Sequence, residues 1–282
     1  MMVRQLLASA ALLAGALSMS ATRAHAQQSR SDYQQQLNDW TEQCRSRSER
    51  NGDDHYRACL LRQTGQRATG QRIAVDAGQN GGIDVAAWDG DSVLIGAKVE
   101  ASAPSEREAQ EIASEVHIVV DGGTIRADGP SMHDDAWWSV SFQILVPHQS
   151  DLSLDAHNGG IRVANVEGAM ELSTENGGIA LRDVGGDVHG RTTNGGVHIR
   201  LAGDHWTGTG LDVETTNGGV QLTLPSDYSA RLETGTVNGG MRVDFPITVQ
   251  GRIGRHLSTQ LGNGGATIRA TTRNGGVTVR HG

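Results

Sequence analysis

Residues 174–200 read TENGGIALRDVGGDVHGRTTNGGVHIR and contain the same Asn-Gly-Gly triplet twice, 18 residues apart. Each triplet is followed by an alternation of apolar and other residues, which is typical of a strand with one buried face. Such a repeat indicates stacked coils of about 20 residues, as in a solenoid. The triplet occurs eight times in the chain, beginning at Asn80, Asn158, Asn176, Asn194, Asn217, Asn238, Asn263 and Asn274.

Apolar residues occupy the third and fifth positions after each of these asparagines. The third-position row is Ile83, Ile161, Ile179, Val197, Val220, Met241, Ala266 and Val277, and the fifth-position row is Val85, Val163, Leu181, Ile199, Leu222, Val243, Ile268 and Val279. A threonine also recurs two positions before five of the triplets, at Thr174, Thr192, Thr215, Thr236 and Thr272. We therefore predict an all-β fold over residues 71–282, a single-stranded parallel β-helix in which each triplet is a corner between strands.

The chemistry of the triplet suits a corner. Glycine reaches positive φ without steric cost, and asparagine hydrogen-bonds to nearby backbone. If the asparagines point inward, their amides can also bond from coil to coil as a ladder that satisfies buried polar groups. We expect these residues to be structural rather than ligand-binding. Gly168 and Gly186 each follow their asparagine by ten residues and predict a second corner halfway round the coil.

The segment between Asn80 and Asn158 is less regular. Asp121-Gly122-Gly123 is a candidate degraded corner, although the residues after it are out of phase with the apolar rows. Ser105 and Glu108 form a capping-box pattern, which predicts one short inserted helix near residues 105–116. The run 136–147 is rich in strand-forming residues.

The N-terminus has the pattern of an export signal. Arg4 precedes an apolar run over residues 6–19, and Ala24-His25-Ala26 ends in the small residues that signal peptidases prefer. We predict a signal peptide over residues 1–26, cleaved after Ala26, and hence a periplasmic or secreted protein. The alternative is an uncleaved N-terminal anchor. No later segment is apolar enough to span a bilayer.

Cys44 and Cys59 are the only cysteines. An exported chain meets an oxidising compartment, so we predict that they form a disulfide. Closing a loop of about 15 residues contributes about 3 kcal/mol in the chain-entropy model. The alternative, a metal site that adds His55, lacks a fourth ligand. Residues 27–70 are polar, and we predict a disulfide-closed cap that is helical or irregular.

The net charge and the absence of catalytic motifs limit the classes of function that we expect. The formal net charge is −8, which disfavours nucleic acid and anionic membranes as partners. No nucleophile elbow, phosphate loop or metal motif occurs in the sequence. We therefore expect no catalytic residues, no metal and no cofactor. The alternative is a carbohydrate-active β-helix enzyme, with candidate groups at Asp183, Asp187, Glu214, His157, His189, His198 and His205.

The stretches GQNGGIDV, DLSLDAHNGGI, GRTTNGGV, LDVETTNGGV and ARLETGTVNGGMRVDFPITVQGRIGR resemble a bacterial family of exported β-strand-repeat proteins, named as adhesins and of unknown function. The family is similar to the head domains of autotransporter adhesins. The resemblance covers about residues 71–282. It implies a right-handed β-helix, an envelope or surface location and no catalytic residues, and it links some relatives with envelope stress.

We therefore expect a non-enzymatic binding or scaffold rod of the envelope, with a glycan or a protein as its partner. Guanidinium groups suit phosphate and carboxylate ligands. The simpler interpretation is a solvated face whose arginines pair with neighbouring acids. Unpaired strand edges at the ends of the rod also predict end-to-end self-association. The outward arginines that could line one ligand-binding face are Arg162, Arg182, Arg200, Arg242, Arg269 and Arg280.

Overall fold

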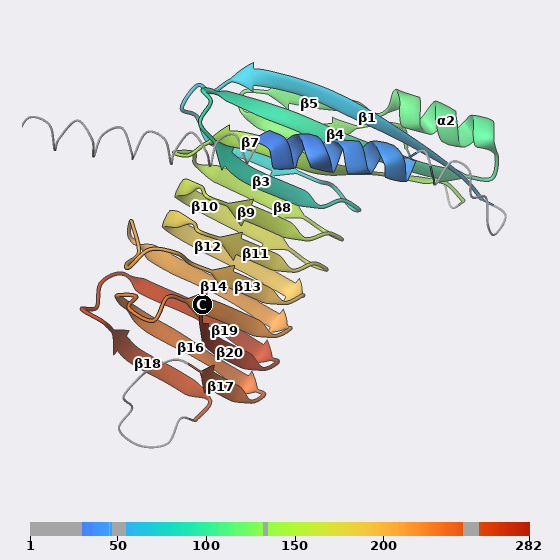
Figure 1. Cartoon of the computed structure of the whole chain (residues 1–282). Coiled ribbons are helices and arrows are strands. Elements are labelled where there is room, and N and C mark those ends of the chain that lie inside the picture. The colour runs from blue at the N-terminus through green and yellow to red at the C-terminus, as the bar shows by residue number, and fades with distance from the viewer. Residues whose placement is uncertain (1–29, 45, 47–54, 132–134, 245–253) are drawn as a thin grey trace, which may run out of the picture.

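The computed structural model describes residues 30–44, 46, 55–131, 135–244 and 254–282. The expected signal peptide and its cleavage site lie outside these residues. The chain forms two ten-stranded sheets that share one apolar core, and most strands stack like rungs (Figure 1). Among the described residues, no helix has the length and apolar character needed to cross a membrane.

The first sheet is parallel from β7 to its last strand and antiparallel at its other end, where β1 pairs with β4 and β4 with β7. In spatial order its strands are β1 (Tyr56–Arg67), β4 (Ser92–Ala103), β7 (Trp137–Pro147), β3 (Ile83–Trp88), β9 (Ile161–Ala164), β11 (Ile179–Arg182), β13 (Val197–Arg200), β15 (Val220–Leu224), β20 (Val277–His281) and β17 (Met241–Asp244).

The second sheet is parallel except at its two edges, where β18 and β5 are antiparallel to their neighbours. In spatial order its strands are β18 (His256–Leu261), β16 (Ala230–Asn238), β19 (Thr267–Asn274), β14 (Gly210–Asn217), β12 (Gly185–Asn194), β10 (Glu167–Thr174), β8 (Leu152–Ala156), β2 (Ile73–Asp76), β6 (Thr124–Asp128) and β5 (His117–Asp121).

The fold is all-β, as the sequence predicts, but both sheets are mixed rather than parallel throughout. Two predictions outside the regular repeats are wrong. Tyr56–Arg67, expected within a helical or irregular cap, is the edge strand β1. Asp121-Gly122-Gly123 is the turn of the β5–β6 hairpin, with φ of 55° and 85° at its glycines, and not a coil corner.

Seven of the eight predicted corner asparagines form one side-chain ladder. The amide of Asn158 donates to the side-chain oxygen of Asn80 at 3.0 Å, and each later bond in the ladder is 2.8–2.9 Å. All seven side chains are exposed, so this amide ladder runs along the outer edge of the stack and not inside it. Its order is Asn80, Asn158, Asn176, Asn194, Asn217, Asn274 and Asn238.

The buried polar groups at these corners are threonines. The hydroxyl of Thr192 is fully buried and donates to the carbonyl oxygen of Gly177, in the neighbouring coil, at 2.6 Å. Thr174, Thr215, Thr236 and Thr272 repeat this bond at 2.7–2.8 Å. The recurring threonine therefore bonds each coil to its neighbour from the inside.

Space, not positive φ, requires glycine at the first of the two glycine positions in each of the seven stacked triplets. None of their glycines has a left-handed φ, but a Cβ on Gly177 would overlap the carbonyl oxygen of Gly159 in the neighbouring coil. The positive-φ prediction holds only for the Asn263 triplet, where Gly264 and Gly265 have φ of 76° and 132°. That triplet lies in the turn between β18 and β19, which is why Asn263 is absent from the ladder.

The second turn of the coil lies three residues before each predicted glycine. Asn165 and Asp183 have φ of 60° and 52° there, and both residue types tolerate left-handed backbone. Gly168 and Gly186 instead lie at the starts of β10 and β12, where strands pack closely. Of the two, Gly186 has a positive φ, 106°.

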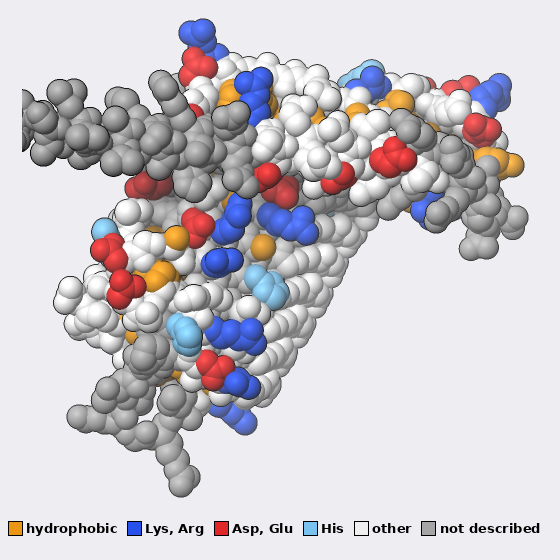
Figure 2. All heavy atoms as spheres, viewed as in Figure 1, with side chains coloured by type: hydrophobic (Ala, Val, Ile, Leu, Met, Phe, Trp, Pro, Cys, Tyr) orange, Lys and Arg blue, Asp and Glu red, His pale blue; other side chains and the backbone are white. Residues whose placement is uncertain are grey.

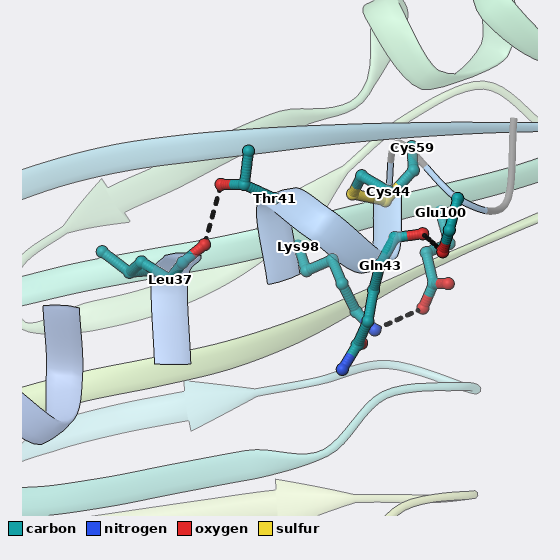
Figure 3. The surroundings of a disulfide bond; sticks show 8 residues. Leu37, Thr41, Gln43, Cys44, Cys59, Lys98 and Glu100 are labelled. Carbon is teal, nitrogen blue, oxygen red and sulfur yellow. Dashed lines mark hydrogen bonds and ion pairs between the residues drawn. A yellow bond between two sulfur atoms is a disulfide. The ribbon is translucent and has the colours of Figure 1, made fainter. Parts of the chain in front are cut away.

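A helix over residues 30–44 lies on the outer face of the first sheet, where Tyr33, Leu37 and Trp40 pack with Leu145 (Figure 1). The disulfide between Cys44 and Cys59 joins this helix to β1, and its use of both thiols excludes the alternative metal site (Figure 3).

Two further local interactions occur in the N-terminal part of the chain. Lys98 forms an ion pair with Glu100 at 3.0 Å (Figure 3). Its ammonium also lies over the ring of Trp40. The inserted helix α2 (Glu106–Glu115) begins at Ser105, whose hydroxyl accepts a bond from the backbone N–H of Glu108, as the capping pattern predicts.

Candidate functional site

The outward side chains of β9, β11 and β13 surround a groove of about 650 Å³. Small residues create it: Ala180 lies between Arg162 and His198 on the neighbouring strands, and Ala164 lies beside Arg182. Figure 2 shows basic and histidine side chains gathered on this face. We call it the arginine groove, formed by Arg162, Ala164, Ala180, Arg182, His198 and Arg200.

Arg182 and Arg200 are directly opposite each other on β11 and β13. Neighbouring strands are about 4.8 Å apart, so two positive charges share one short stretch of surface. Both side chains are exposed, and neither has an ion pair with another described residue. Like charges directly opposite in a sheet are destabilising, so this pair does not serve the stability of the fold.

The third arginine of the groove has an acidic partner. Arg162 lies 3.7 Å from the carboxylate of Asp84 on β3. Burial raises the pKa of the Asp84 carboxyl, and the Arg162 and Arg182 guanidiniums oppose that rise. Asp84 is the only acidic side chain that lines the groove, so its three arginines leave a net positive charge. Asp84 pairs with Arg162 and attracts Arg182 more weakly, whereas Arg200 has no ion pair with another described residue.

The outer face of the second sheet has the opposite arrangement. In one row across its strands, acidic residues alternate with a histidine or an arginine: Glu171, His189, Asp212, Arg269 and Glu233. Arg269 lies 3.7 Å from Asp212, and in the next row Arg191 lies 2.6 Å from Glu214. Charges on this face are therefore compensated by their cross-strand neighbours.

The structure divides the six arginines predicted to share one face. Arg162, Arg182 and Arg200 line the groove. Arg280 and Arg242 are further along the same sheet, on β20 and β17, and Arg242 bonds to Asp244 at 2.7 Å. Arg269 is on β19 of the second sheet, because the turn at Asn263 does not follow the pattern of the stacked corners.

Some of the groups considered for catalysis lie close together, since His189 and Glu214 line one hollow on the outer face of the second sheet. Asp187 pairs with His189 at 3.2 Å, His157 with Glu175 at 2.9 Å, and His205 with Asp204 at 2.6 Å. The hydrogen bond from His205 lowers the pKa of the exposed Asp204 carboxyl. Within the part of the chain that the structure describes, no three His, Cys, Asp or Glu residues are placed to hold a metal ion.

Sequence reasoning missed the residues that shape the groove. Ala180 and Ala164 occupy the fourth and sixth positions after their asparagines, where most other repeats have longer side chains. This contrast could have indicated the groove. The pairing of Asp84 with Arg162 depends on β3 and β9 being neighbours although 78 residues separate the two positions.

Together, the stacked sheets and the open groove define an all-β repeat protein with an exposed basic surface. The chain belongs to the family described as Toastrack DUF4097, whose model matches residues 74–280. No curated protein matches the sequence.

Solved structures resemble the chain at low identity. A "putative cell adhesion protein" from Clostridium sporogenes is 9% identical with a TM-score of 0.40, and the match covers 79% of this chain and 100% of that one. A "putative adhesin" from Bacteroides fragilis is 12% identical with a TM-score of 0.35, covering 79% and 97% respectively. A third, a "putative adhesin" from Parabacteroides distasonis, is 12% identical with a TM-score of 0.33, covering 75% and 97%.

Proposed function

We propose that the protein is an exported, non-enzymatic binding or scaffold module of the bacterial envelope, an adhesin in the broad sense. The proposal includes the finer description of the fold as a right-handed, single-stranded β-solenoid. Parallel neighbours in the middle of both sheets support that description, since parallel crossover connections are right-handed in nearly all proteins. The signal-like N-terminus supports export.

One observation carries the proposal: the exposed, like-charged pair Arg182 and Arg200 in the arginine groove. The coils that carry these two arginines are joined by the ladder bond from Asn194 to Asn176. They are also joined by the bond from the Thr192 hydroxyl to the carbonyl oxygen of Gly177. A sheet that holds exposed arginines on neighbouring strands suits recognition of an extended anionic partner. Preorganised groups of this kind lose little entropy on binding.

Two measurements test the proposal. The full-length precursor, expressed in a bacterial host, is expected in the periplasm or medium with Gln27 as its first residue. The purified mature protein is expected to sediment with isolated envelope material, whereas an unrelated exported protein of similar charge stays in solution. An uncleaved cytoplasmic product, or equal sedimentation of the two proteins, would contradict the proposal.

A second candidate function is a self-assembling rod. The four-residue strand β17 is the last strand of the first sheet and pairs only with β20 among the described strands. An unpaired edge is a template for another chain. Light scattering over a wide concentration range tests it, and a mass that stays monomeric throughout counts against assembly.

A further inference from the structure

We infer that the arginine groove binds an acidic polysaccharide, whose carboxylate or phosphate groups are contacted by Arg182 and Arg200. This inference rests on the proposed binding function and specifies its ligand. Three properties of the groove support this occupant: its net positive charge, the direction of its arginine row and the composition of its lining.

The charge favours an anion. Arg182 and Arg200 repel each other across neighbouring strands, whereas every arginine named above on the second sheet's outer face has an acid within 4 Å. An anionic group placed between the two guanidiniums removes that repulsion. It also accepts charge-assisted hydrogen bonds, for which the planar guanidinium fork is well suited.

The direction of the row favours a polymer. Sixth-position residues on successive strands follow the stack, from Arg182 to Arg200, then Thr223 and Arg280. A chain lying across the strands meets these groups one after another. A single small anion would occupy only the first pair.

The lining favours sugar. Ala164 and Ala180 leave a shallow hollow, and His198, Gln221 and Thr223 beside it offer donors and acceptors for hydroxyl groups. The protein as a whole carries a formal net charge of −8. This charge opposes densely charged partners such as DNA, which has one phosphate per about 1.7 Å of helix axis, more than a polysaccharide with sparse charges.

The experiment compares two double variants with the unmodified mature protein. Arg182→Gln with Arg200→Gln removes the free charges of the groove. Arg191→Gln with Arg269→Gln makes the same change in net charge on the second sheet's outer face, also at exposed side chains. Circular dichroism and thermal unfolding verify that both variants fold.

Binding is measured by biolayer interferometry to polygalacturonate, to a phosphomannan, to neutral dextran, to duplex DNA and to vesicles containing phosphatidylglycerol. We expect binding to at least one of the two acidic polysaccharides that weakens with added salt. The groove variant is expected to bind at least about tenfold more weakly, since charge-assisted bonds are lost. The control variant is expected to stay within about twofold, because its positions lie outside the groove. Which polymer binds distinguishes carboxylate from phosphate as the recognised group.

Three results would overturn the inference: binding to neither acidic polysaccharide, stronger binding to vesicles or DNA, or equal losses in both variants. Sedimentation with envelope material separates this failure from failure of the proposed function. If the groove variant still sediments as the unmodified protein does, the binding function stands and the groove is not its site.

Discussion

Asn274 donates its side-chain amide to Asn217 at 2.8 Å, although 57 residues separate them in the sequence. Asn238 lies between them in sequence, yet it follows Asn274 in the ladder and donates to it at 2.8 Å. The last repeat, β19 and β20, is therefore inserted between two earlier repeats in both sheets. Asn274 thus bonds to both Asn217 and Asn238, whose coils are consecutive in the sequence but not adjacent in the stack.

Replacing Asn274 by Ala should destabilise the protein more than the same change at Asn263. Asn274→Ala removes two ladder bonds, each with a net value of about 1 kcal/mol, so the expected loss is about 1–2 kcal/mol. Asn263 is outside the ladder, and its substitution should cost less than about 0.5 kcal/mol, as at ordinary surface positions. Urea unfolding of the two variants measures both, and equal losses would refute a stabilising role for the ladder.

Gly177→Ala should be among the most damaging single-methyl changes in the chain. The new Cβ would overlap the carbonyl oxygen of Gly159, and the coils would have to separate. Overpacking of this kind costs about 1–3 kcal/mol, and here the obstacle is backbone that cannot rotate away.

Gly240→Ala is the matched control for that change. Gly240 belongs to the outermost stacked triplet, and a Cβ there would have no neighbour within 4 Å. Thermal unfolding should show little change for this variant. A comparable fall in Tm for both variants would indicate that backbone freedom, and not coil spacing, sets the need for glycine.

Removing the disulfide should weaken the packing of the helix over residues 30–44 on the first sheet. The two sheets should stay folded. Cys44 and Cys59 close a loop of about 15 residues, for which the chain-entropy model gives about 3 kcal/mol. In a Cys44→Ala, Cys59→Ala variant, hydrogen exchange should increase over residues 30–44 while β12 and β14 stay protected. Loss of protection across both sheets would mean that the helix is needed for the whole fold.

Alkaline pH should destabilise the protein through Tyr228. Burial, with a smaller contribution from Asp204, raises the pKa of this phenol from 10.0 to about 12. The folded state therefore holds its proton more tightly than the unfolded state does. The resulting stability is fully present below pH 10 and is lost as the pH rises through 12.

The test of this titration is Tyr228→Phe, which keeps the ring and removes the ionising group. The urea midpoint of the unmodified protein should fall more steeply between pH 10 and pH 12 than that of the variant. Parallel curves would show that other groups cause the alkaline loss.

Much of the stack was predictable because it depends on local patterns. The alternation at Ile179 and Leu181 predicts buried positions, and the 18-residue step to Val197 places like residues on neighbouring strands. The order of the last coils was not predictable. Residues around Asn238 and Asn274 have the same threonine, triplet and apolar positions, so either coil satisfies the pattern beside Asn217.

The wrong predictions for Asn263, for strand β1 and for the arginine face each have a physical cause. Asn263 has the triplet but lies in a turn between antiparallel and parallel strands, where positive φ is the requirement. Strand β1 is half exposed on both faces, so its sequence lacks a clear alternation. For the groove, the arginine positions were visible in sequence, but their division between two faces required the register.

The inserted repeat makes the pairing of one segment depend on another that follows it in the chain. Strand β14 pairs with β19, and β15 pairs with β20. Among the described strands, β16 and β17 pair with the rest of the stack only through β19 and β20. Residues 230–244 therefore reach their native place in the two sheets only after residues 267–281 lie between them and the preceding coil.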